Sequence, residues 1–452
     1  VGFGRCASSL WITMSSNPVY AVHLPILFHP DPKNMLVVGF GLGNTLYTAT
    51  RYGLQESACV ELVPDEVLTA PYFHPENHGV MDSARVKMIF NDGRNVILTS
   101  SAKYDIISFN AIHPKLSPAL YTHDFYHLCD RALAPRGTIC AWLPTNGLSL
   151  TEFRSLLLSF MDVFPHCTLW YCNPSNLILL GTREPFKPDY AELRRRMQDP
   201  FISRDLAEIS LSQPLSFLSL FMMGEQRLGE LLKGAPLNTD GHPLVEFSKV
   251  MAPVVPLDTY HWLLDNMEPV SACLTWNEPG GADSLSALAR DLNYWFEARK
   301  TLYRGKFASW VFEEHAVAFE LYRRAGIMNS EDQYIQHFLG GASPDPDSLA
   351  TAAAVGRNDF TVRFQLANYY NGIGKRQEAR RWYREVLAIR PRQADAWFHL
   401  GLVEEDLGNP SAAEQAFIRA LEVNPASPQT LINLGLIRYR AGDLPRAEKY
   451  FK

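Results

Sequence analysis

Several features are scarce in this sequence, and each scarcity excludes a class of protein. No apolar run reaches the ~18 residues that a membrane-spanning helix needs, and no signal-peptide pattern opens the chain. Basic residues are not in excess, because 42 Lys and Arg stand against 48 Asp and Glu, a formal charge of −6. General nucleic-acid binders carry a basic excess, so we expect no nucleic-acid partner.

Cysteines are few and scattered. The chain has seven, with no CxxC pair among them. An odd number at these spacings argues against a disulfide framework and against a structural zinc site. We therefore expect no bound metal and a reducing, cytoplasmic compartment. Cysteines within apolar, strand-like runs are expected to act as small buried hydrophobes.

Length and composition predict several globular domains. The 452 residues are about three times a typical ~150-residue domain. With 47% hydrophobic and 20% charged residues, the chain can build a packed core. We predict an N-terminal domain over residues 1–250, a helical connector of unassigned role over 251–357, and a repeat region over 358–452.

The N-terminal half alternates short apolar runs with stretches of helical length. Such alternation predicts an α/β fold with a parallel, doubly wound sheet. Residues 167–171 and 177–181 flank an Asn-Pro turn, which predicts an antiparallel hairpin after that sheet. Residues 188–247 are expected to be mostly helical. The predicted strands cover residues 35–39, 58–62, 86–90, 105–109 and 138–143, and the clearest helices cover 44–52 and 122–133.

The C-terminal region repeats every 34 residues. Gly374, Gly408 and Gly442 keep this spacing, and so do small, aromatic and proline positions in a constant order. The period and the order resemble the tetratricopeptide repeat, an all-α helical hairpin. We predict repeats over 360–393 and 394–427 and a third that breaks off at the end of the sequence. Such arrays dock peptides, so a protein partner is expected.

A glycine-rich turn follows the first predicted strand. The sequence GFGLGN, residues 39–44, leaves the strand and opens a helix. Gly39, Gly41 and Gly43 allow a tight turn in which a ligand can approach backbone N–H groups. Glycine turns after strands are common, so this motif is weak without further support.

Two acidic residues supply that support. Glu61 ends the second predicted strand, where a carboxylate can accept hydrogen bonds from both ribose hydroxyls. Asp92, followed by Gly93, comes after the third strand, from where a carboxylate can reach an adenine amino group. Three features at successive strand ends describe one crevice, so we predict a nucleoside site. An NAD oxidoreductase fits less well, because its pattern would be GxGxxG and Asp92 would be unexplained.

These motifs together resemble the polyamine aminopropyltransferase (spermidine synthase) family, within the class I S-adenosylmethionine-dependent methyltransferase-like fold. Two further segments, FHPENHGVMD (73–82) and LNTDGHPLVEF (237–247), look most like the large bacterial members. The main resemblance lies in HPDPKNMLVVGFGLGNT (29–45), CVELVPDEV (59–67), VKMIFNDGRN (86–95), YDIISFN (104–110) and LYTHDFYHLCDRALAPRGTICAWL (120–143).

The resemblance implies a context for the start of the chain. In the large bacterial members a hydrophobic, membrane-embedded segment often precedes the synthase domain. This sequence begins with Val1 rather than Met. We therefore expect that an N-terminal membrane segment is missing and that this is the soluble portion of a membrane-anchored protein.

The resemblance also implies a reaction. The donor would be S-adenosylmethionine or its decarboxylated form, and a propylamine or methyl group would pass to an amine acceptor. Alkyl amines titrate near ~10, so the acceptor must lose a proton before it attacks. The family places one Asp at the end of the fourth strand and a second before a proline. Here these positions are Asn110, which cannot act as a base, and His113.

Further departures leave the chemistry open. His113 or Asp124 would assist the proton transfer, although His113 is equally well interpreted as a loop imidazole. The family's acid in the glycine loop, which would repel the carboxylate of intact S-adenosylmethionine, is Leu42 here. The family's Tyr-His-Glu segment aligns with residues 17–19, Asn-Pro-Val. The alternative is a catalytically inactive nucleoside-binding scaffold or sensor that docks partner proteins through its repeats.

Overall fold

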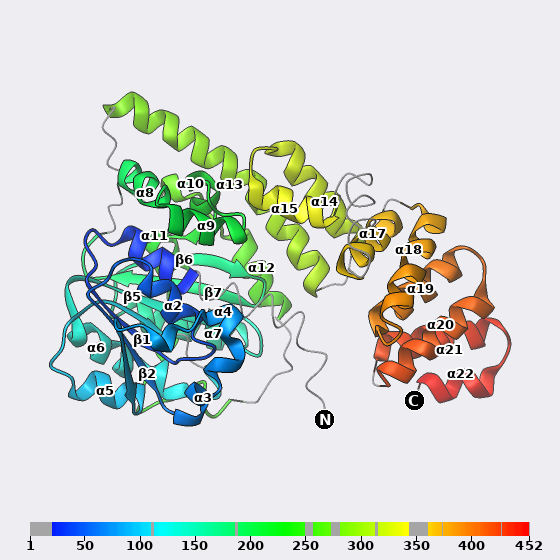
Figure 1. Cartoon of the computed structure of the whole chain (residues 1–452), viewed down its shortest axis with the longest axis horizontal. Coiled ribbons are helices and arrows are strands. Elements are labelled where there is room, and N and C mark those ends of the chain that lie inside the picture. Colours follow the sequence, from blue (N-terminus) through cyan, green and yellow to red (C-terminus); the bar gives the residue numbers. More distant parts are fainter. Residues whose placement is uncertain are drawn as a thin grey trace. The chain divides into compact units, whose positions relative to one another are not determined.

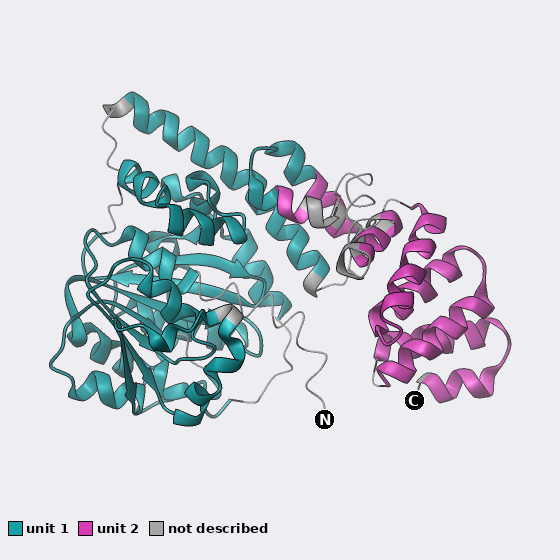
Figure 2. Cartoon of the chain, viewed as in Figure 1, with its two compact units in different colours: residues 1–314, 324–335 teal, residues 315–323, 336–452 magenta. Residues whose placement is uncertain are grey.

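The computed structural model divides into two compact units, residues 1–314 with 324–335 and residues 315–323 with 336–452 (Figure 2). Each unit is considered by itself. The predicted boundaries at 250 and 357 stay a prediction. The residues that the structure describes are 20–109, 113–185, 189–248, 256–272, 281–311, 315–342, 360–372, 374–425 and 427–451.

The first unit is built on one eight-stranded sheet with the order β3-β2-β1-β4-β5-β7-β6-β8 (Figure 1). The five strands β1 to β5 are parallel, whereas β7 runs antiparallel to both of its neighbours. The predicted doubly wound α/β fold is confirmed. The strands are β1 (Asn34–Val38), β2 (Glu56–Glu61), β3 (Val86–Phe90), β4 (Tyr104–Phe109), β5 (Leu133–Pro144), β6 (His166–Asn173), β7 (Asn176–Thr182) and β8 (Phe221–Met223).

Two details of the sheet differ from the prediction. β5 begins at Leu133 rather than at 138, with a shift in its register against β4. β8 adds an antiparallel partner to β6 inside the region that was expected to be helical. Its three residues are too few to show a periodic pattern. The predicted hairpin is present as β6 and β7.

Helices cover both faces of the sheet because its central strands are apolar on both sides. Residues 20–28 and α2 pack on one face, where Ile26 and Leu46 join Met35 in a buried cluster. On the other face, α6 brings aromatic rings against the end of β4, with the Phe109 and Phe125 centroids 5.6 Å apart, and Phe160 of α7 packs on Tyr126 of α6. The helices after β1 are α2 (Asn44–Thr50), α3 (Pro64–Leu68), α4 (His74–Asn77), α5 (Gly93–Thr99), α6 (His123–Ala132), α7 (Leu150–Met161), α8 (Tyr190–Met197), α9 (Pro200–Glu208), α10 (Pro214–Leu218) and α11 (Glu225–Leu231).

Part of the predicted helical connector packs against the sheet. The helices α12 (Leu257–Asp265) and α13 (Gly281–Val311) belong to the first unit, and the ring of Tyr303 stacks on that of Tyr171 from β6 at 3.8 Å. Arg299 of α13 donates to both carboxylate oxygens of Asp332, and neither side chain is exposed. This buried ion pair anchors the helix, because breaking it would leave an uncompensated charge.

A buried lysine lies two turns beyond Arg299 along α13. Lys306 Nζ donates to the hydroxyl of Tyr334 at 2.9 Å. Burial, and then the nearby Arg299 charge, lowers the pKa of Lys306 to about 7. After α13 come α14 (His315–Met328) and α15 (Gln333–Ala342). None of the described helices combines the length and the apolarity that crossing a bilayer requires.

The second unit contains the predicted repeats as three helical hairpins. Gly374, Gly408 and Gly442 each have φ of 76–78°, the left-handed conformation that ends a helix and favours glycine. Gly401 allows close packing, since a Cβ there would lie 2.5 Å from the ring of Phe417. The tetratricopeptide prediction is confirmed. The helices are α17 (Phe360–Gly372), α18 (Arg376–Ile389), α19 (Ala394–Asp406), α20 (Pro410–Val423), α21 (Pro428–Arg440) and α22 (Leu444–Phe451).

The described cysteines behave as the apolar runs predict. All five are buried free thiols. Burial raises the pKa of the Cys140 and Cys167 thiols to about 12, so neither is a reactive thiolate near neutral pH.

Candidate nucleoside site

The register of three parallel strands brings the predicted nucleoside residues to one edge of the sheet. Val38 at the end of β1 pairs with Val60, and Glu61 pairs with Phe90 at the end of β3. The glycine loop, Glu61 and Asp92 therefore follow neighbouring strand ends. The sheet reverses its order between β1 and β4, and ligands of open α/β sheets bind outside the carboxyl ends at such a point.

The glycine loop needs its glycines for two different reasons. The φ angles of Gly39, Gly41 and Gly43 are 93°, 56° and 89°, all in the left-handed region. A Cβ at Gly43 would also lie 2.8 Å from the ring of Phe40, which packs beneath the loop. At Gly41 a Cβ would meet nothing within 4 Å, so the outer side of the loop is open.

Glu61 holds the loop to the second strand. Its side chain is 5% exposed. One carboxylate oxygen accepts the N–H of Phe40 and the other accepts the N–H of Val63, both at 2.8 Å. Each oxygen keeps a second lone pair. The carboxylate can thus fix the loop and still accept hydrogen bonds from a bound sugar.

A second carboxyl group lies beside Glu61 and was missed in the sequence. Glu66 stands in the first turn of α3. Burial, and then the negative charge of Glu61, raises the pKa of Glu66. The charge of Glu61 therefore acts on a second carboxyl group next to it. The only signal in the sequence was the motif CVELVPDEV itself, which carries both residues.

Asp92 caps the helix that follows β3. Its Oδ1 accepts the N–H of Asn95 at 2.9 Å, and Oδ2 receives no donor from the part of the chain that the structure describes. Gly93 is required beside it, because a Cβ there would lie 2.6 Å from Val38 Cγ1. The start of α5 therefore rests directly on the end of β1, next to the glycine loop.

Asn77 is a further residue that the motif analysis did not single out. It is buried, and its Nδ2 donates to the carbonyl oxygens of Leu42 at 3.0 Å and Ala70 at 2.8 Å. Its Oδ1 accepts the N–H of Gly79 at 3.0 Å. This single amide joins the segment 70–79 to the glycine loop. Asn77 itself lies in FHPENHGVMD (73–82), which was noted for its resemblance alone.

Of the predicted catalytic residues, the structure describes His113 and Asp124 but not Asn110. Asn110 and residues 17–19 lie outside the described residues. The Nδ1 of His113 accepts the N–H of Lys115 at 3.2 Å, and its Nε2 lies 2.8 Å from the carbonyl oxygen of Asn146. A carbonyl can only accept, so this network assigns the proton to Nε2. Both ring nitrogens are engaged with the backbone.

Asp124 belongs to a clamp at the starts of α5 and α6. Its Oδ2 accepts the N–H of Asp240 at 2.8 Å. The Asp240 carboxylate in turn accepts from Thr122, at 2.7 Å, and from both terminal nitrogens of Arg94. The segment LNTDGHPLVEF thus closes over these two helices. Its partners are more than 100 positions away in the sequence, so no local pattern revealed the clamp.

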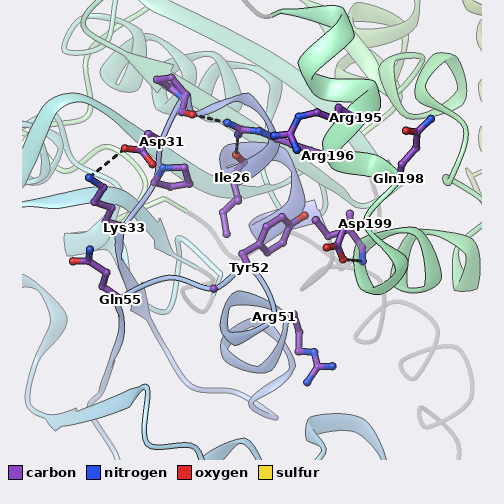
Figure 3. Close-up of a pocket in the computed structure, with 14 residues that line it drawn as sticks. Ile26, Asp31, Lys33, Arg51, Tyr52, Gln55, Arg195, Arg196, Gln198 and Asp199 are labelled. Atoms are coloured by element: carbon purple, nitrogen blue, oxygen red, sulfur yellow. Dashed lines mark hydrogen bonds and ion pairs between the residues drawn. The ribbon is translucent and has the colours of Figure 1, made fainter.

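A cavity of about 600 Å³ lies at the opposite, amino-terminal edge of β1 and β2 (Figure 3). Lys33 and Gln55, which line it, directly precede these strands. Its cations are held by neighbours: Lys33 contacts Asp31 at 3.2 Å, and Arg196 donates to the carbonyl of Ile26 at 3.1 Å. These contacts join α8 to residues 20–28. The cavity is lined by neither of the two predicted nucleoside acids.

Comparison with known families agrees with this geometry. Residues 19–176 match the spermine/spermidine synthase domain, and residues 364–417 and 403–452 match the tetratricopeptide repeat. The chain therefore contains a region that matches the spermine/spermidine synthase domain and a region that matches the tetratricopeptide repeat. The resemblance read from the motifs is therefore confirmed.

Curated relatives match this synthase domain over part of their length. A polyamine aminopropyltransferase of Nitrosomonas europaea is 35% identical over 147 residues, which are 32% of this chain and 45% of the relative. A spermidine synthase of Dictyostelium discoideum is 28% identical over 190 residues, which are 39% of this chain and 66% of the relative. The chain spans about half to two thirds of the length of these relatives.

Solved structures give a similar list of neighbours. The spermidine synthase from Thermotoga maritima aligns with a TM-score of 0.34 and 22% identity, covering 38% of this chain and 60% of that one. A probable spermidine synthase from Corynebacterium glutamicum aligns with a TM-score of 0.37 and 22% identity, covering 54% and 81%.

Proposed function

We propose that the synthase domain binds S-adenosylmethionine or its decarboxylated form and transfers a propylamine or methyl group to an amine acceptor. The observation that carries the proposal is the shared strand edge, where the Glu61 carboxylate binds the N–H of Phe40 in the glycine loop while one oxygen of Asp92 accepts no donor from the described residues. In this proposal Glu61 takes the ribose hydroxyls and Asp92 takes the adenine amino group.

The group-transfer reaction depends mainly on how the protein positions the two reactants. The neutral nitrogen of the acceptor attacks a carbon next to the sulfonium, the carbon–sulfur bond breaks, and the thioether nucleoside leaves. The sulfonium is already activated, so holding the two reactants in line supplies most of the rate. The proton that the amine loses must still reach a base or water.

The donor side and the base are two of the places where this chain departs from the family pattern. Leu42 brings no charge to the glycine loop, so we propose that the carboxylate of intact S-adenosylmethionine is tolerated. His113 offers no unoccupied ring nitrogen, because Lys115 N–H and the Asn146 carbonyl take both. Asp124 has one oxygen bound to Asp240 N–H, and we propose it as the proton acceptor of the transferase.

The engaged imidazole favours a second candidate. A nucleoside-binding scaffold or sensor needs the glycine loop, Glu61 and Asp92, but it needs no base. In that role the repeats would bind a partner protein that responds to whether the nucleoside site is occupied.

Ligand-dependent thermal stabilisation tests the part that both candidates share. S-adenosylmethionine, its decarboxylated form and methylthioadenosine should each raise the melting temperature if they bind the folded state. Glu61→Gln should abolish the shift. Glu56→Gln, which removes the same charge at the other end of β2, should keep it. If no ligand stabilises the native chain, both candidates fail.

Product analysis then separates the two candidates. The chain is incubated with each donor and with putrescine, and the amines are identified by mass spectrometry. An added propylamine or methyl group supports the transferase. Ligand-dependent stabilisation without any transfer product supports the sensor.

A further inference from the structure

The tetratricopeptide unit carries a groove between the second helices of its first two repeats. The groove has a volume of about 410 Å³ and runs between α18 and α20, with α19 as its floor. Leu387, Trp397 and Leu400 supply apolar surface, whereas Arg384 and Arg419 stand on opposite sides. An apolar floor between two cations fits a ligand that is itself apolar and anionic.

The positive charge continues along α18. Residues 375–392 contain seven Lys or Arg and two Asp or Glu, a net charge of 7 − 2 = +5. A second hollow of about 390 Å³ lies on this helix and shares Arg384 with the groove. Arg380 and Arg381 also line it. The two hollows form one surface, which we name the α18 groove.

A buried carboxylate fixes two of the arginines of the α18 groove, whereas Arg381 and Arg419 pair with Glu385 and Glu422 on their own helices. Glu404 of α19 is 2% exposed, and it accepts from Arg384 at 2.8 Å and from Asn409 at 3.0 Å. Arg380 lies 3.7 Å from the same carboxylate. A guanidinium has five N–H donors in a planar fork, so each arginine keeps donors for a carboxylate outside. The cations are thereby positioned before any partner arrives.

The next groove shows that the fold does not require this arrangement. One repeat further, the position of Arg384 is occupied by Ile418 and that of Glu404 by Arg438. Ile418 brings no charge to the rim of that groove, and Arg438 forms an ion pair with Glu414, as Arg384 does with Glu404. The same backbone hairpins therefore stack without the cationic rim, and the rim of the α18 groove is a property of this sequence.

We propose that the α18 groove binds an acidic segment of a partner protein, with an apolar side chain on the Trp397 floor and carboxylates on the flanking arginines. A protein segment is favoured over a nucleic acid because the groove has an apolar floor and the whole chain has a formal charge of −6. The inference is independent of the chemistry of the synthase domain.

Fluorescence anisotropy of the full chain with a labelled peptide tests this proposal. The probe is a ~12-residue peptide of Glu and Asp with two Leu residues. Arg381→Glu/Arg419→Glu should weaken binding at least about tenfold, the equivalent of ~1.4 kcal/mol. Arg440→Glu/Arg446→Glu is the matched control, because it makes the same charge change at similarly exposed side chains. Arg381 and Arg419 are 73% and 62% exposed, and Arg440 and Arg446 are 64% and 65% exposed. The control should change binding less than about twofold.

Several outcomes would overturn the proposal. Equal losses in the two double variants would mean that only net charge is sensed. A Leu-free acidic peptide that binds as well as the probe would remove the role of the apolar floor. An oligonucleotide that displaces the probe at lower concentration would assign the surface to nucleic acid. Absence of binding by the unmodified chain would refute the proposal directly.

Discussion

Replacing Glu61 by Gln is the sharpest perturbation of the synthase domain. The two side chains have the same shape, so packing is kept. The carboxylate accepts two backbone N–H groups, from Phe40 and Val63, at 2.8 Å each. A carboxamide has one oxygen, so it can accept only one of them. Its NH2 group then faces the other N–H, and two donors oppose each other in a buried place.

The magnitude follows from these contacts. A hydrogen bond to a charged group contributes about 1.5–3 kcal/mol, and a buried donor left unpaired costs about 1–3 kcal/mol. The Glu66 carboxyl partly offsets the loss, since the pKa of Glu66 is raised in part by the charge of Glu61 and that repulsion disappears. We expect the free energy of unfolding to fall by about 2–3 kcal/mol.

Chemical denaturation at pH 7, followed by circular dichroism, measures this loss. Glu56→Gln is the control, because Glu56 is at the other end of β2 and its contact with Lys87 at 3.6 Å is solvent-exposed. That variant should change stability by less than ~1 kcal/mol. A Glu61→Gln chain as stable as the native one would refute the assignment of Glu61 as the anchor of the glycine loop. Equal losses in both variants would refute it as well.

Three further predictions address other parts of the synthase unit. Gly93→Ala should cost about 1–3 kcal/mol of stability, because its Cβ would lie 2.6 Å from Val38 Cγ1, and a denaturation midpoint that does not move would contradict that packing. Lys306→Met should be more stable than the native chain at pH 7. Because the pKa of Lys306 is lowered, the native fold binds fewer protons than the unfolded chain between pH ~7 and ~10.5, and the stability of the native chain rises with pH by up to ~1.4 kcal/mol per unit. The difference in unfolding free energy between the variant and the native chain should therefore narrow from pH 7 to pH 9. A difference that stays constant in denaturation series at these pH values would disprove this. Leu42→Asp should weaken the binding of intact S-adenosylmethionine about tenfold relative to that of its decarboxylated form in calorimetric titrations. An unchanged ratio of the two dissociation constants would exclude Leu42 as a determinant of donor choice.

The elements that the sequence predicts well are those with a local signal. The strand β1 is a continuous apolar run, β2 to β4 are short with apolar centres, and their order places the glycine loop beside Glu61. The repeats were recognisable because Gly374 and its equivalents recur in phase with alanines and aromatics. The strand signal lies in consecutive residues, and the repeat signal is a fixed 34-residue period, so both can be read from the order of residues alone.

The features that escaped prediction depend on distant partners. Asn77 acts on the carbonyl of Leu42, 35 positions away, and Arg94 binds Asp240 across 146 positions. Such pairs leave no periodic trace. The network around His113 is also invisible in the sequence, because the partners of its two ring nitrogens are backbone groups and carry no residue signature.

The anchoring of the glycine loop by Glu61 makes loop geometry and ligand occupancy interdependent. If a ribose hydroxyl donates to the carboxylate that accepts Phe40 N–H, the same carboxylate takes part in both loop anchoring and nucleoside binding. Thermodynamic linkage is reciprocal, so if nucleoside binding stabilises the anchored loop, a change that stabilises the anchored loop tightens nucleoside binding by the same coupling free energy. Substitutions of Asn77, which donates to the Leu42 carbonyl of the loop and contacts no ligand in our assignment, would then change the affinity for the nucleoside.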